Sequence, residues 1–135
     1  MLSIIASSIA GVVCFVVLDY VFLAQLAKDF YLKGLASHIT IKDGSLAPYL
    51  PAVPLVYIVG IASIWILVLS RATDVRQAAL HGAILGFLMY AFYDFTNLAT
   101  LKEYPWSLAI VDILWGTFLI GAVSAIMFVV KDLFA

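Results

Sequence analysis

The stretch LSIIASSIAGVVCFVVLDYVFLAQL, residues 2–26, decides the fold class of this chain, because its only charged side chain is Asp19. About 20 apolar residues of helix cross the roughly 30 Å hydrocarbon core of a bilayer. Backbone polar groups in lipid must find their hydrogen bonds within the segment, which a helix provides. The stretch is therefore predicted to be a membrane-spanning helix.

Three further apolar runs of similar length follow, at residues 49–70, 77–101 and 105–130. Each is long enough to span a bilayer as a helix. Four spans predict an all-α fold, an integral membrane four-helix bundle, in which residues 1–135 form a single transmembrane domain.

The composition of the chain agrees with this class and excludes several others. Hydrophobic residues make up 66% of the sequence and charged residues 11%, whereas a soluble domain has roughly 45–50% and about 25%. The net charge of −1 gives no basic surface for a nucleic acid. A single cysteine, Cys14, excludes paired thiols and cysteine-based zinc sites.

The polar segment 27–48 separates the first two spans. The apolar residues Phe30, Tyr31, Leu32 and Leu35 lie among charged residues near its beginning, which predicts a short amphipathic helix lying on the membrane interface. The sequence Asp43-Gly44-Ser45 predicts a turn. At the end of the third span Tyr104 is expected to act as an interfacial anchor.

Both termini are predicted to be cytoplasmic. An even number of spans puts them on one side of the membrane, together with the turn at residues 71–76. That turn holds Arg71 and Arg76, whereas the lysines of the opposite side are spread over a long loop. Cytoplasmic turns are enriched in such closely spaced positive charges.

Three intramembrane carboxyls are the most informative feature. Asp19 and Asp94 lie seven residues before the ends of their spans, and Asp112 lies seven residues after the start of its span. All three of these ends face the same side. At 1.5 Å per residue each carboxyl is roughly 10 Å inside that boundary, so the three groups are predicted to share one layer. Without a cation they cannot all stay charged, and at least one is expected to be protonated.

Polar and aromatic companions are predicted in the same layer, on the third and fourth spans. They fit a structural network, a site for a ligand or a proton, or a site for a hard cation. The metal site is the weakest of the three, because His81 lies about 30 Å away along the helix, and no metal is expected. The companions are Tyr90, Tyr93, Asn97 and Trp115.

Small residues recur at every fourth position of the third and fourth spans. This spacing lets helices approach closely, either within one chain or between two copies, so a homo-oligomer is an open alternative. The residues are Ala78, Gly82 and Gly86, followed by Thr117, Gly121 and Ala125.

Two motifs, YDFTNLATL at residues 93–101 and DILWG at residues 112–116, carry a resemblance to a known family. They are similar to motifs of the bacterial membrane proteins grouped as domain of unknown function 2177. Leu18-Asp19 resembles that family's aspartate near the end of its first helix, and Phe30-Tyr31 its following aromatic pair. The chain departs from the family at residues 52–55, where an aromatic pair is usual.

The resemblance implies a small four-span protein of the bacterial inner membrane with cytoplasmic termini, and it favours lipid chemistry. The leading hypothesis is a non-enzymatic protein that binds a hydrophobic or lipidic ligand, or a membrane partner, through a polar-floored pocket. The floor is expected to consist of Asp19, Asp94, Asn97 and Asp112, and the walls of Tyr90, Tyr93 and Trp115.

Two other hypotheses stand beside it. The first is a membrane enzyme acting on fatty-acyl or isoprenoid substrates, with Asp94 or Asp112 as general acid and base. The second is a proton-coupled carrier or channel with the aspartates as a relay. The sequence has no activated nucleophile, no histidine-rich iron motif and no cofactor fingerprint, which favours the non-enzymatic interpretation without a cofactor.

Overall fold

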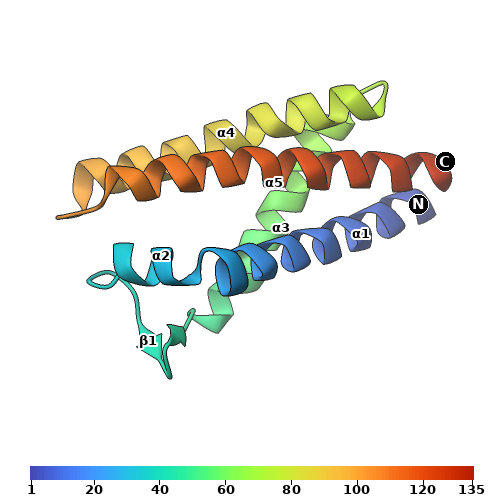
Figure 1. Cartoon of the computed structure of the whole chain (residues 1–135). Helices are drawn as coiled ribbons and strands as arrows, with labels where there is room; N and C mark the ends of the chain where they lie inside the picture. Colours follow the sequence, from blue (N-terminus) through green and yellow to red (C-terminus); the bar gives the residue numbers. More distant parts are fainter.

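The computed structural model of the chain consists of four long helical stretches, with a short helix and a pair of short strands between the first two (Figure 1). Its described side chains are those of residues 1–44 and 47–135. The predicted all-α membrane architecture is confirmed, because four helical stretches are long and apolar enough to cross a membrane. They are Leu2–Leu26, Leu50–Leu69, Val75–Thr100 and Trp106–Leu133.

The first two of these stretches contain π-helical turns, so they are divided into several elements. In chain order the elements are α1 (Leu2–Asp19), the π-helix η1 (Tyr20–Leu26), α2 (Lys28–Gly34), β1 (Ile41–Lys42), β2 (Ser45–Leu46), the 3₁₀ helix η2 (Leu50–Ala52), α3 (Val53–Ile64), the π-helix η3 (Trp65–Leu69), α4 (Val75–Thr100) and α5 (Trp106–Leu133).

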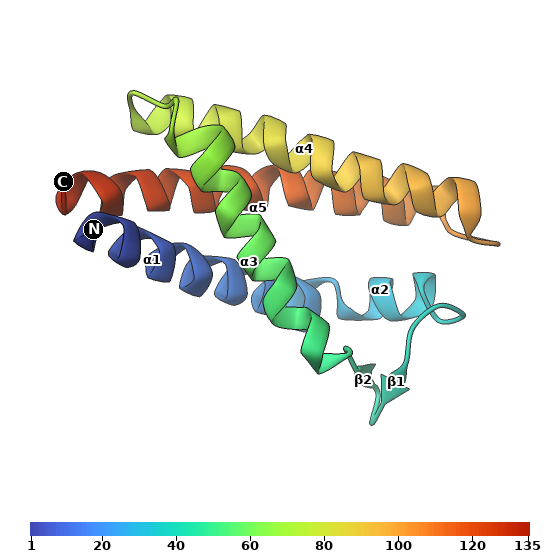
Figure 2. The same cartoon turned by 180° about the vertical axis from the view of Figure 1, so that it is seen from behind.

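Helix α5 is the centre of the bundle. It lies between α1 and α4 and packs against both along much of its length (Figures 1 and 2). Helix α3 crosses the other three obliquely, so it is in contact with them over part of its length only. The two termini lie at the same end of the bundle, as an even number of spans requires.

Glycines bring α4 and α5 into close contact. A Cβ atom added at Gly86 would lie 2.2 Å from the carbonyl oxygen of Gly116. One added at Gly116 would lie 2.1 Å from the ring of Tyr90, and one at Gly82 would lie 2.3 Å from Ser124 Oγ. The small residues that left a homo-oligomer open are thus used, at these positions, for packing within the chain.

Side chains at the helix ends explain where α4 and α5 differ from their predicted bounds. Helix α4 begins two residues earlier, because the Asp74 carboxylate accepts hydrogen bonds from the backbone N–H groups of Arg76 and Gln77 at 2.8 and 2.9 Å. Helix α5 continues three residues further. Near its end Lys131 donates a hydrogen bond to the carbonyl of Leu69 at 3.2 Å.

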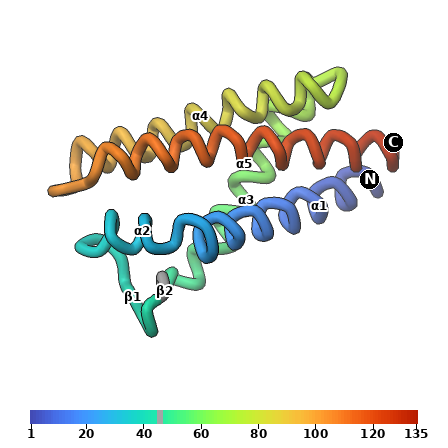
Figure 3. The backbone as a smooth tube through the Cα atoms, in the orientation of Figure 1, coloured from blue at the N-terminus to red at the C-terminus, as the bar shows by residue number. Residues whose placement is uncertain are grey.

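The segment between the first two spans contains the predicted amphipathic helix, α2. It continues nearly in the direction of α1 (Figure 3), and one face packs against the first turns of α5, where Tyr31 is buried. The predicted turn connects the short antiparallel strands β1 and β2. Asp43 and Gly44 have φ values of 51° and 70°, as tight hairpin turns require.

Two apolar clusters pack along α5, and the three carboxyls lie between them. One cluster lies toward the termini and centres on Leu119, Ile120, Val123 and Met127. The other lies beside α2 and consists of Tyr31, Tyr104, Leu108 and Ala109.

Candidate functional site

The carboxyls of Asp19, Asp94 and Asp112 converge in the interior of the bundle and are called the acidic cluster below. Asp94 and Asp112 lie close enough for their carboxyls to influence one another. Asp19 lies within the electrostatic influence of Asp112. Asp94 is fully buried, and the other two are partly buried. Three helices therefore deliver one acidic group each to a common layer.

The end of α1 holds the first carboxyl in place. Trp115 of α5 donates a hydrogen bond from Nε1 to Oδ1 of Asp19 at 3.1 Å. The π-helix η1 begins directly after Asp19 and presents Phe22, which stacks on the Trp115 indole with ring centroids 3.9 Å apart. Because π-helical turns often occur at functional sites, this local geometry supports Asp19 as a candidate functional residue.

Two tyrosines from outside the spans close the other side of the cluster. Tyr104, in the turn between α4 and α5, donates a hydrogen bond to Asp94 Oδ1 at 2.7 Å. Tyr31 of α2 donates one to Asp112 Oδ1. Asn97 lies close to Tyr104. The α2 segment and the α4–α5 turn are thereby tied to the membrane-embedded carboxyls.

Both tyrosines stay protonated and act as donors. Burial raises the pKa of Tyr31 above its usual range, and the negative charge of Asp112 raises it further. Burial also raises the pKa of Tyr104, with a second contribution from its hydrogen bond to Asp94.

The structure brings most of the predicted site residues together. Trp115 contacts the cluster and Asn97 lies beside Tyr104, as described above. The partly buried Tyr90 lies near all three carboxyls. Tyr93 is the exception, and its assignment as a pocket wall is wrong. Its side chain is 60% exposed on the outer surface, because a residue next to the buried Asp94 is rotated by about 100° around the helix.

Sequence reasoning missed the two tyrosines that bind the carboxyls. Tyr104 is not an interfacial anchor, because it is buried against Asp94. Nothing in its local sequence distinguishes it from the other aromatic residues at span ends. One feature of the sequence pointed to Tyr31. It belongs to the aromatic pair Phe30-Tyr31, which carries part of the family resemblance.

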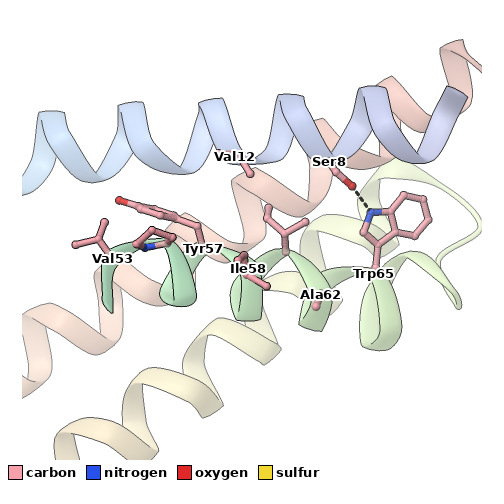
Figure 4. Close-up of a pocket in the computed structure, with 9 residues that line it drawn as sticks. Ser8, Val12, Val53, Tyr57, Ile58, Ala62 and Trp65 are labelled. Carbon is pink, nitrogen blue, oxygen red and sulfur yellow. Dashed lines mark hydrogen bonds between the residues drawn. The ribbon is translucent and has the colours of Figure 1, made fainter. Parts of the chain in front are cut away.

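A groove with a volume of about 600 Å³ lies between α1 and α3. None of the seven predicted site residues lines it, so the predicted pocket differs from the observed hollow. One end is closed by Trp65, whose Nε1 donates a hydrogen bond to Ser8 Oγ at 2.9 Å (Figure 4). The lining residues are Ser8, Val12, Val53, Pro54, Tyr57, Ile58, Ile61, Ala62 and Trp65.

Tyr57 connects this groove with the acidic cluster. Its ring lines the groove and packs edge-on against Phe15, with centroids 5.1 Å apart. Its hydroxyl points along the groove, away from Trp65 (Figure 4), and lies within the electrostatic reach of Asp19.

A family model described as a predicted membrane protein, domain of unknown function 2177, matches residues 4–129. The chain belongs to this family. The matched range includes the acidic cluster, Tyr31 and Tyr104. No curated protein and no solved structure matches the chain significantly.

The cluster offers carboxyl groups that can accept hydrogen bonds. Among the side chains of residues 1–44 and 47–135, no three His, Cys, Asp or Glu are arranged to hold a metal ion.

Proposed function

We propose that this integral membrane protein binds a hydrophobic or lipidic molecule without transforming it. The apolar body of the ligand lies in the groove between α1 and α3, and its polar end meets the acidic cluster. The observation that carries the proposal is the position of Tyr57, which lines the groove and lies within the electrostatic reach of Asp19.

The size and lining of the groove support an elongated apolar ligand. Sites for small molecules are usually about 300–1,000 Å³ and mainly apolar, and the groove of about 600 Å³ falls in this range. Surrounding lipid tails are as apolar as the groove, so apolar contact alone gives no selectivity within a membrane. Selection of one ligand then depends on the polar end at the acidic cluster.

The location that we propose is the bacterial inner membrane with both termini on the cytoplasmic side. The acidic cluster then lies nearer the opposite face, beneath α2. A membrane protein or a second copy of the chain remains a further proposed partner, which would bind the outer faces of the helices.

A groove-filling substitution tests the proposal. Ala62 lies on the open side of the groove, and Ala62→Trp fills the space beside it. We expect a hydrophobic molecule to co-purify with the wild-type protein and to be lost from this variant, as measured by mass spectrometry of solvent extracts. Ala99→Trp, on the exposed surface of α4, is the matched control and should retain it. Equal retention by both variants contradicts the proposal.

One observation favours a rival function, a proton-coupled carrier. The proximity of Asp94 and Asp112, together with the bond from Tyr31 to Asp112, forms a chain of exchangeable protons toward α2. We expect no proton flux from the purified protein in proteoliposomes. Flux that Asp112→Asn abolishes would replace the binding proposal by the carrier.

A further inference from the structure

Asp94 is the most deeply buried member of the acidic cluster. Its side chain is 0% exposed, whereas Asp19 and Asp112 are only partly buried. Its Oδ1 accepts the hydrogen bond from Tyr104 at 2.7 Å. Its Oδ2 is buried and has no hydrogen-bond partner among the described residues. Because buried polar atoms normally have partners, this oxygen requires an explanation.

The surroundings of Asp94 offer no positive charge that would stabilise a carboxylate. His38 packs near the Tyr104 ring, with centroids 6.4 Å apart, but it is exposed and its Nε2 contacts the carbonyl of Lys102 at 3.1 Å. An ionised carboxyl that is buried without a compensating charge is strongly destabilising. The titratable groups that lie close to Asp94 are all acids or phenols, namely Asp112, Tyr31, Tyr90 and Tyr104.

The carboxyl of Asp112 is held in the same region of the bundle. Tyr104 bonds to Asp94 and Tyr31 bonds to Asp112, and these two tyrosines pack together in one buried cluster with Leu108. Two ionised carboxyls in such a place would repel each other. A proton on one of them removes both the repulsion and the cost of burying that group as an ion.

We infer that Asp94 is a proton-binding site, in which Oδ2 carries the proton at neutral pH and the carboxyl is a neutral acid. Oδ1 stays the acceptor for Tyr104, so the two oxygens have different roles. The Asp112 carboxylate is available to accept the hydrogen bond of the new O–H group. Asp94 does not line the groove, so this inference goes beyond the ligand-binding proposal and does not depend on it.

Infrared spectroscopy of the full-length protein at neutral pH, in a detergent without ester groups, tests the inference. A protonated carboxylic acid has a carbonyl stretch that is separate from the bands of carboxylates and amides. We expect this band in the wild-type protein, and we expect it to shift when the aspartate side-chain carboxyls carry a heavy carbon isotope. The aspartates outside the cluster are all exposed, and exposed aspartates are ionised at neutral pH.

Two variants assign the band to Asp94. Asp94→Asn keeps an acceptor for Tyr104 and replaces the O–H by a neutral amide group, so it should fold and lose the band of one carboxylic acid. Tyr104→Phe removes the hydrogen bond to Oδ1 and should shift the band without abolishing it. Asp132→Asn, at the exposed end of α5, is the matched control and should leave the band unchanged.

The results that would overturn the inference are equally specific. A wild-type protein without an aspartic acid band at neutral pH would show that Asp94 is ionised, independently of any variant. A band that neither Asp94→Asn nor Tyr104→Phe alters, or that disappears only in Asp112→Asn, would place the proton on another residue. Ala62→Trp in the groove should keep the band whatever its effect on ligand binding, so the two proposals fail separately.

Discussion

Gly86→Ala is expected to prevent stable packing of α4 on α5, although it adds a single methyl group. The new Cβ would lie 2.2 Å from the carbonyl oxygen of Gly116, and a backbone atom cannot move aside as a side chain can. Overpacking usually costs about 1–3 kcal/mol, and more where the backbone must shift. We expect the free energy of unfolding to fall by at least about 3 kcal/mol, as measured by denaturation in detergent micelles.

Gly34→Ala is the matched control. The nearest atom to a Cβ at Gly34 is a methyl group of Leu108 at 3.3 Å, which a small rotation relieves. Its free energy of unfolding should change by less than about 1 kcal/mol. Equal stability of the two variants would mean that α4 and α5 do not approach each other as closely as described.

Tyr31→Ala is expected to release α2 from the bundle. Tyr31 is buried, packs edge-on against Phe22 and donates a hydrogen bond to Asp112. Truncation of a buried aromatic side chain costs about 3–5 kcal/mol. We expect faster hydrogen exchange in residues 28–34 and a lower thermal unfolding temperature, both measured on the purified protein in micelles.

Tyr31→Phe distinguishes the contribution of the hydroxyl group from that of the packing of the ring. It keeps the packing and leaves Asp112 without its donor, which costs about 1–3 kcal/mol for a buried acceptor. Its effect should therefore be clearly smaller than that of Tyr31→Ala. If both variants behave like the wild type, α2 is not held to α5 through Tyr31, and the closure of the acidic cluster is incorrectly described.

The spans and the depth of the carboxyls were predictable because both follow from regular geometry. A run of apolar residues defines a span, and the fixed rise of a helix converts position into depth. Rotation around the helix is less well determined. The expected pocket wall included Tyr93, which is the neighbour of Asp94 on the same helix, whereas the interior of the bundle covers a narrower strip that excludes Tyr93.

The partners of the carboxyls and the groove could not be predicted in the same way. Tyr31 and Tyr104 lie in connecting segments, where no helical period indicates which side chain turns inward. The groove depends on the oblique crossing of α3, and crossing angles arise from the mutual packing of side chains rather than from the sequence of one helix.

An experimental structure of the protein in lipid nanodiscs tests the central claim most directly. It should show the carboxyls of Asp19, Asp94 and Asp112 facing one another and an elongated density between α1 and α3 that ends beside Tyr57 and Asp19. Carboxyls that point to different faces of the bundle, with a groove that ends far from all three, would contradict the account.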